Sequence, residues 1–246
     1  MSKIIKFIAQ DDHVWNVRPR PYPAAKGMPQ WWKDIPAYIA GDTEFSLKPK
    51  PNVTVKRCVP TLDVLCSGYY VPLWADVLIQ DLKDENNNII KDKDNNTVPL
   101  ATWNTETPVL DSWPDAQADN FKHSEGYSRY IFKNCHGWSI KTPPGWSSLF
   151  IHPVAYPDLP FKTISGIVDT DIFQGEINVP FVVKNGFTGL IKNGTPMFQV
   201  IPFKRENWTA EFEVKKPNEH WYSNEKLQAN AVRAYHSLIK NNKTYR

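Results

Sequence analysis

Residues 142–203 constrain the fold more than any other part of the chain. Four short apolar runs lie in this stretch, separated by turns that contain Pro, Gly, Asn or Asp; they occupy 149–151, 164–168, 177–183 and 197–201. Runs of this length with turn residues at both ends are typical of β-strands, whereas an amphipathic helix needs a longer pattern with a 3.6-residue period. The stretch therefore predicts a compact, strongly bent all-β unit.

Three motifs in this stretch resemble the dUTPase and dCTP-deaminase superfamily. They are P-P-G-W at 143–146, G-I-V-D-T-D at 166–171 with Gly-Glu at 175–176, and N-G-T-P-M-F-Q-V-I at 193–201. In that superfamily a P-P-G-Y strand is followed by G-x-I-D-x-D-Y-x-G-E and by a G-D-x-I-A-Q-L strand. The resemblance covers about a quarter of the chain. It implies a mainly β fold with a dUTPase-like β-clip core over residues 131–203.

The same resemblance implies a candidate site. Asp169 takes the place of the Asp that activates water in those enzymes, where Mg²⁺ bridges the phosphates. A bound nucleotide would then be contacted by Asp169, Asp171, Phe173 and Gln199. Two departures oppose catalysis: F-I-H-P-V at 150–154 replaces the Arg-Ser motif that holds the phosphates, and Ile-Phe at 172–173 replaces the tyrosine under the deoxyribose.

A general base contributes little to hydrolysis unless other groups position and neutralise the phosphates. We therefore expect Asp169 and Asp171 to turn the chain between two strands, their carboxylates accepting hydrogen bonds from local backbone N–H groups. A nucleotide pyrophosphatase or deaminase, or a nucleotide-binding regulator, that uses Asp169 with Mg²⁺ is the alternative.

The whole chain also resembles a family of tailed-phage proteins, chiefly of marine phages, that has no established activity. The shared patterns are A-x-K-x-x-P-x-W-W-K at 24–33, C-x-P-x-L-D-x-x-x-x-G-Y at 58–69 and Q-x-I-P-F-K-R at 199–205. This resemblance implies that the chain is phage-encoded. Our leading hypothesis is a virion structural or assembly protein, present in the host cytoplasm and then in the virion. Its partners would be other phage or virion proteins, and it would be oligomeric or bound to an assembly.

We expect three parts along the chain: a Pro- and Trp-rich arm over 1–55, the β domain over 56–214, and a helix with a tail over 215–246. Prolines at 19, 21 and 23 keep the arm extended there, because each Pro fixes its own φ and disfavours helix in the preceding residue. The arm either lies on its own domain, anchored by Trp31 or Trp32, or docks these indoles against a neighbouring subunit.

The β domain is expected to begin with a short helix capped by Thr61 and ended by Ser67 and Gly68, before a strand-like stretch over 69–79. A polar hairpin over 78–100 follows, with Asn-rich turns. Its Asp residues lack the D-x-D-x-D-G order and the closing Glu of a calcium loop, so no metal site is predicted.

The strongest helical pattern lies over 223–240, where apolar residues share one face. The candidate interface residues on this helix and the arm are Trp31, Trp32, Leu227, Tyr235 and Leu238.

Composition and motifs exclude several function classes. The formal net charge of +3 is too small for a general nucleic-acid binder. The histidines have no zinc-enzyme spacing, and no glycine-rich phosphate loop occurs. No apolar run approaches the roughly 20 residues that span a bilayer. The leading prediction is therefore a non-enzymatic, cofactor-free protein that acts through protein–protein contacts; a carbohydrate-binding module based on exposed aromatic residues is a third possibility.

Overall fold

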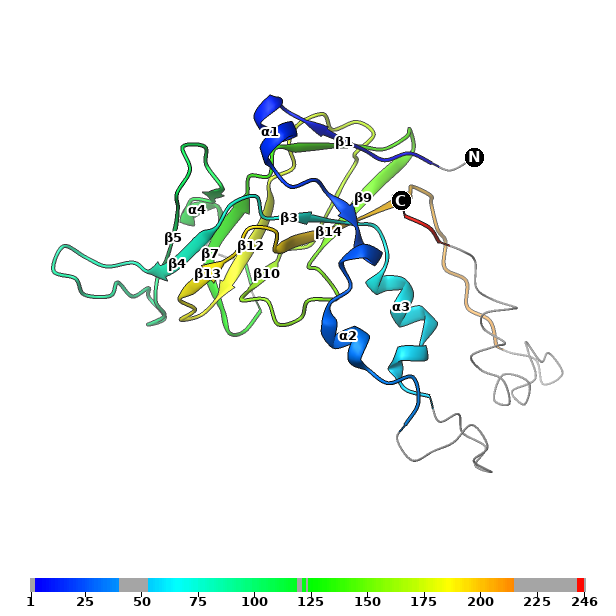
Figure 1. Cartoon of the computed structure of the whole chain (residues 1–246), viewed down its shortest axis with the longest axis horizontal. Coiled ribbons are helices and arrows are strands. Elements are labelled where there is room, and N and C mark those ends of the chain that lie inside the picture. Colours follow the sequence, from blue (N-terminus) through cyan, green and yellow to red (C-terminus); the bar gives the residue numbers. More distant parts are fainter. Residues whose placement is uncertain (1–2, 40–52, 119–120, 123, 215–242, 246) are drawn as a thin grey trace. The chain divides into compact units, whose positions relative to one another are not determined.

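The structure is a computed structural model, which describes residues 3–39, 53–118, 121–122, 124–214 and 243–245. Short antiparallel strands dominate these residues (Figure 1), which confirms the predicted mainly β class. Contacts divide the chain into two compact units, one formed by Met1–Tyr22 with Gly68–Arg205 and the other by Pro23–Ser67 with Glu206–Arg246. The contacts thus group the first strand and helix with the β unit, not with the arm. The helix expected over 223–240 lies outside the described residues.

The first unit contains nearly all the strands. In chain order its elements are β1 (Lys6–Ala9), α1 (Asp12–Val17), β2 (Tyr22–Pro23, at the boundary with the second unit), β3 (Tyr69–Pro72), β4 (Val77–Asp81), β5 (Pro99–Trp103), β6 (Leu110–Ser112), α4 (Asp115–Ala118), β7 (Tyr127–Asn134), β8 (Trp138–Lys141), β9 (Trp146–Ile151), β10 (Phe161–Thr163), β11 (Gly166–Val168), β12 (Val179–Lys184), β13 (Gly189–Ile191) and β14 (Pro196–Lys204). Residues 142–203 thus form β9 to β14, and the expectation of an all-β stretch without helices is confirmed.

The described strands form four sheets. Their orders are β1-β8, β10-β12-β7-β6, β11-β9-β14-β3-β2 and β13-β4-β5. The long strand β14 lies inside the five-stranded sheet, where it pairs with β3 on one side and with β9 on the other, both antiparallel. Because β11 also pairs with β9, the end of β11, the start of β9 and the end of β14 meet at one edge.

Alternate residues of these strands supply a continuous core, since successive side chains in a strand point to opposite faces. The core rings form edge-to-face or tilted pairs, with Phe161 5.4 Å from Phe181 and Phe150 5.8 Å from Phe198 between centroids. Other core members are Val71, Leu73, Val77, Ile79, Ile140, Val179, Ile191 and Val200. Each such side chain contributes about 1.5–3 kcal/mol when it leaves water.

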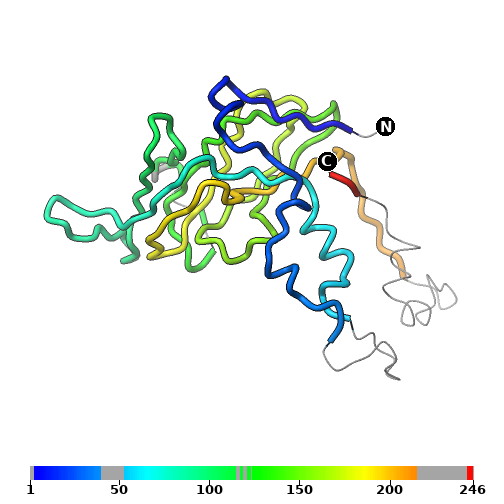
Figure 2. The backbone as a smooth tube through the Cα atoms, viewed as in Figure 1, coloured from blue at the N-terminus to red at the C-terminus, as the bar shows by residue number. Residues whose placement is uncertain are grey.

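The polar hairpin is present, and its tip contains two successive turns. β4 and β5 pair antiparallel, and the turns that join them project beyond the core strands (Figure 2). Asp84 and Asp92 each accept two backbone hydrogen bonds from their own turns. Asn87 and Asn95 have φ angles of 66° and 62°. Asn tolerates such positive φ angles better than most other residues.

Only some of the glycines at bends need to be glycine. Gly194 has a φ of +85°, which favours glycine, whereas Gly166 has no positive φ and a Cβ there would meet no atom within 4 Å. At Gly175 a Cβ would meet only the Phe173 ring, at 3.2 Å. The strictest requirement lies at Gly68, where φ is +70° and a Cβ would lie 1.9 Å from the Val200 carbonyl oxygen. The main chain of β14 therefore passes directly beside this turn.

The second unit contains short helices, namely the 3₁₀ turns η1 (Ala24–Gly27) and η2 (Val55–Arg57) and the helices α2 (Gln30–Asp34) and α3 (Val59–Leu65). Trp32 in α2 is buried, and Lys56 Nζ lies 5.4 Å from its ring centroid, whereas Trp31 is partly exposed. The expected cap at Thr61 is wrong, because α3 begins two residues earlier and has a Pro in its first turn, where its missing N–H costs nothing.

None of the helices in the described ranges is both long and apolar enough to cross a membrane.

Candidate functional site

The two carboxylates of the candidate nucleotide site, Asp169 and Asp171, lie in the turn that follows β11. The backbone N–H of Phe173 donates to the Asp169 carbonyl at 2.9 Å, and the N–H of Thr170 donates to the Val168 carbonyl at 2.9 Å. The strand pairing places this turn beside Ser147 at the start of β9 and Arg205 just after β14. The side chains of Ser147, Asp169, Asp171 and Arg205 contact one another, and we call them the Arg205 cluster.

Arg205 holds Asp171 by a bidentate ion pair. Its Nη1 donates to Asp171 Oδ1 at 2.7 Å and its Nη2 to Oδ2 at 2.5 Å, a geometry that matches the planar guanidinium to the carboxylate. The hydrogen bonds from Arg205, with a further one from the Gly145 N–H at 2.7 Å, lower the pKa of Asp171 to about 2. The same contacts raise the pKa of Arg205. Asp171 is therefore ionised across the physiological range and committed to this pair.

Asp169 belongs to the same cluster but is more open. Its Oδ1 accepts a hydrogen bond from the Ser147 hydroxyl at 2.6 Å and lies 3.2 Å from Arg205 Nη1, while its side chain is 55% exposed. Among the described residues Arg205 is the one cation that contacts either carboxylate. Most partners of the two carboxylates are thus groups distant in the sequence, namely the side chains of Arg205 and Ser147 and the backbone N–H of Gly145, and not the local backbone N–H groups that were expected. In this arrangement Asp169 helps to join three strand ends.

A buried hydroxyl network lies beneath the cluster. Thr170 Oγ1 is 2.8 Å from Thr142 Oγ1 and 2.9 Å from Ser148 Oγ, and the Thr142 hydroxyl also donates to the Trp146 carbonyl at 2.9 Å. These hydroxyls are buried, and each has a partner, as stable cores require. Sequence reasoning missed the network and Arg205; the one available signal was the pair of serines at 147–148 beside the P-P-G-W motif.

The other predicted nucleotide contacts divide between two places. Phe173 follows Asp171 in the same turn and is exposed. Gln199 is fully buried opposite Ile151 in β14, and its Oε1 accepts from the Val154 N–H at 3.2 Å. It lies four residues from Phe203, the partner of Ser147, or roughly 13 Å along the strand. The fold therefore does not bring Gln199 to Asp169.

The position that departs from the phosphate-binding motif holds a neutral histidine. The Thr163 N–H donates to His152 Nδ1 at 3.3 Å, so Nε2 carries the proton and faces the Tyr156 carbonyl oxygen at 3.2 Å. Burial lowers the pKa of His152. A neutral ring whose two nitrogens both face protein groups offers no charge to a phosphate.

The described ranges contain no group of three or more His, Cys, Asp or Glu side chains arranged to hold a metal ion. In the hairpin, the carboxylates of Asp84 and Asp92 accept hydrogen bonds from their own turns. The hydrogen bonds that Asp84 accepts from Asn88 lower the pKa of Asp84. These carboxylates therefore stabilise the turns in which they lie.

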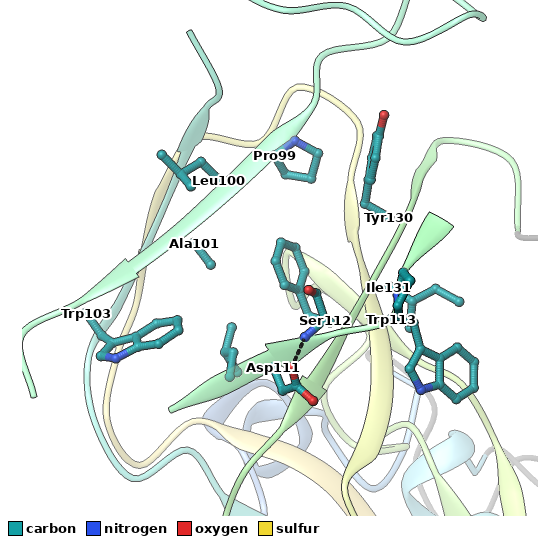
Figure 3. Close-up of a pocket in the computed structure, with 12 residues that line it drawn as sticks. Pro99, Leu100, Ala101, Trp103, Asp111, Ser112, Trp113, Tyr130 and Ile131 are labelled. Atoms are coloured by element: carbon teal, nitrogen blue, oxygen red, sulfur yellow. Dashed lines mark hydrogen bonds between the residues drawn. The ribbon is translucent and has the colours of Figure 1, made fainter. Parts of the chain in front are cut away.

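An aromatic groove lies between the edge of the hairpin and the edge of a second sheet (Figure 3). The β5–β6 groove has a volume of about 470 Å³. Its lining is mostly apolar and includes Pro99, Ala101, Trp103, Leu110, Trp113, Tyr130 and Phe132. The one charged lining residue, Asp111, forms an ion pair with Lys133 and accepts from the Ser112 N–H at 2.8 Å. The groove therefore suits an apolar or aromatic ligand group better than a charged one.

A second surface feature lies in the other unit. The 208–214 segment has no helix or strand, and it exposes Trp208, Phe212 and Val214 by 85%, 95% and 94%. Single exposed apolar residues are ordinary on protein surfaces, whereas three large ones within seven residues are unusual. Trp31 is also partly exposed, but Trp32, the second predicted interface residue of the arm, is buried. The other predicted interface residues, Leu227, Tyr235 and Leu238, lie outside the described residues.

No protein-family model matches the chain, and no curated protein sequence matches it.

Proposed function

We propose that the chain is a phage-encoded structural or assembly protein of the virion, which acts through protein–protein contacts. The observation that carries the proposal is the near-complete exposure of Trp208 and Phe212. Trp is among the residues that contribute most to binding energy at protein interfaces, and aromatic residues generally are enriched there. A chain that leaves both rings in water as a monomer would bury them when it meets a partner.

The Arg205 cluster supports a role without catalysis. Asp171 is held by two hydrogen bonds from Arg205, and Asp169 by Ser147 and the same guanidinium. A nucleotide hydrolase needs cationic groups free to hold phosphates, but Arg205 is already committed to the two carboxylates. Nucleotide hydrolysis through Asp169 and Mg²⁺ therefore has less support than the contact function.

We further propose that residues 131–203 form a β-clip related to the dUTPase core. The P-P-G-W motif leads into β9, and the G-I-V-D-T-D motif forms β11 and the turn after it. The N-G-T-P motif supplies the positive φ of Gly194 before β14. Each motif thus lies at a strand boundary, as a shared fold would require.

The partners we propose are other virion or phage proteins, met first in the host cytoplasm and then in the particle. The mainly apolar groove and the exposed rings both favour a protein surface. A sugar would need free polar groups around the aromatic rings, and the Asp111 carboxylate in the groove is already bonded to Lys133 and Ser112.

Mass spectrometry of purified phage particles tests the proposal. We expect the chain at a fixed copy number relative to the major particle proteins, retained after nuclease treatment and density-gradient purification. A particle that carries Trp208→Ser with Phe212→Ser should contain less of the chain, while Ile172→Ser, which alters another exposed apolar residue, should not change the amount. Presence in the infected-cell lysate and absence from particles would contradict the proposal.

A further inference from the structure

We propose that the 208–214 segment of one copy of this chain adds as a β-strand to the free edge of β5 in a second copy. Its apolar side chains would enter the β5–β6 groove of that copy. The inference rests on the proposed contact function and names one of its partners, which is the chain itself.

The donor segment has the pattern of a strand without a partner. Its sequence W-T-A-E-F-E-V places apolar residues at 208, 210, 212 and 214 and polar ones between them. A period of two puts all four apolar residues on one face of an extended chain. No backbone hydrogen bond joins these residues to any described part of the chain, and three of the four side chains are almost fully exposed. The segment is therefore ready to pair with a sheet edge.

The acceptor edge is β5. In the three-stranded sheet β5 lies at one end of the order β13-β4-β5, so its outer side has no strand partner among the described residues. The Leu82 N–H donates to the Val98 carbonyl at 2.8 Å, and the register continues as Gln80 opposite Leu100. Because hydrogen-bonded pairs alternate in an antiparallel ladder, the N–H and C=O groups of Ala101 and Trp103 point away from β4. These groups can receive a new strand.

The neighbouring edge, β6, is less suited to accept a strand. It has only three residues, and the Asp111 carboxylate already accepts from the Ser112 N–H. Pro114 follows, which has no N–H to donate. Such features protect an edge from pairing. The strand would therefore pair with β5, and β6 and β7 would form the wall of the groove.

Size and chemistry agree with this occupant. The volume of about 470 Å³ lies within the range of ligand pockets, and the lining rings of Trp103, Trp113 and Tyr130 suit an incoming indole or phenyl ring. The side chains of Glu211 and Glu213 fall on the opposite face of the added strand, where they remain in water. Since one chain supplies both the unpaired strand and the matching edge, the occupant is a second copy.

Sedimentation velocity of the purified full-length chain tests the inference, over about 1 to 100 µM, where micromolar association becomes visible. We expect dimers or larger species to increase with concentration. The double variant Trp208→Ser, Phe212→Ser should be monomeric, because both exposed aromatic rings of the donor segment are lost. Ala101→Pro should also be monomeric, because it removes an outward N–H while leaving the β4–β5 ladder intact. Ile172→Ser is the matched control and should associate like the wild type.

Mixing the two monomeric variants gives the sharpest result. The Ala101→Pro copy retains the donor segment and the Trp208→Ser, Phe212→Ser copy retains the acceptor edge, so a 1:1 dimer should appear on mixing. If Ala101→Pro loses the far-ultraviolet circular dichroism of the wild type, Trp113→Ala takes its place as the acceptor variant. A wild type that stays monomeric, or a mixture that forms no dimer, would overturn the inference.

The two proposals fail separately. If the chain is monomeric but still present in purified particles, the strand addition between copies is wrong and the proposed virion function stands. If the chain associates as described but is absent from particles, only the proposed virion function is wrong.

Discussion

Acidification should destabilise the β unit through one buried histidine, His136. The Trp138 N–H donates to His136 Nδ1 at 3.0 Å, so the proton is on Nε2, which donates to the Ile177 carbonyl at 2.9 Å. Protonation of Nδ1 would break the first bond and place a charge in the core, 5.2 Å from the Phe198 ring centroid. Burial accordingly lowers the pKa of His136 from 6.5 to about 4.

The sign of the effect follows from comparing the two states. Between pH 6.5 and 4 the unfolded chain binds a proton at this residue and the folded chain does not, so the free energy of unfolding falls as pH falls. A pKa difference of about 2.5 at about 1.4 kcal/mol per unit gives a loss of about 3 kcal/mol between pH 7 and pH 4. Against a total stability of about 5–15 kcal/mol this loss is large.

Urea unfolding at a series of pH values, followed by near-ultraviolet circular dichroism, measures this loss. His136→Gln has no titratable ring, so its free energy of unfolding should fall by about 3 kcal/mol less than that of the wild type over the same range. The half-buried His152 is present in both proteins and cancels in the difference. Equal slopes for the wild type and His136→Gln would refute the reasoning, as would an NMR titration of His136 with a midpoint above pH 6.

Three further predictions concern the Arg205 cluster, the turn at Gly68 and catalysis. Arg205→Met should lower the urea midpoint, because it leaves two adjacent carboxylates without a cation. An unchanged midpoint would show that Arg205 does not stabilise the fold. Gly68→Ala should destabilise by at least about 2 kcal/mol, because its Cβ would lie 1.9 Å from the Val200 carbonyl oxygen, while Gly166→Ala should stay within about 0.5 kcal/mol; similar midpoints would contradict the difference. Incubation with dUTP or dCTP and Mg²⁺ should release no pyrophosphate or ammonia; turnover that disappears in Asp169→Asn would restore the enzyme alternative.

The sequence determined the secondary structure where local patterns were strong. The apolar runs at 149–151 and 197–201 lie in β9 and β14, and the Asn-rich stretch formed turns with positive φ at Asn87 and Asn95. These outcomes depend on side-chain alternation and on the φ and ψ preferences of single residues. The exact start of α3 was missed, because helix starts depend on which of several neighbouring residues can cap them.

Only the tertiary structure decided which residues meet. Arg205 is 34 residues from Asp171 in the sequence, and no local pattern links them; the pairing of β9 with both β11 and β14 brings them to 2.5 Å. The same pairing buries Gln199 away from Asp169. The groove between β5 and β6 also depends on tertiary structure, because these two strands are edges of separate sheets. A sequence window fixes the backbone conformation of a few residues, whereas contacts between distant residues follow from strand order and register, which the whole core determines.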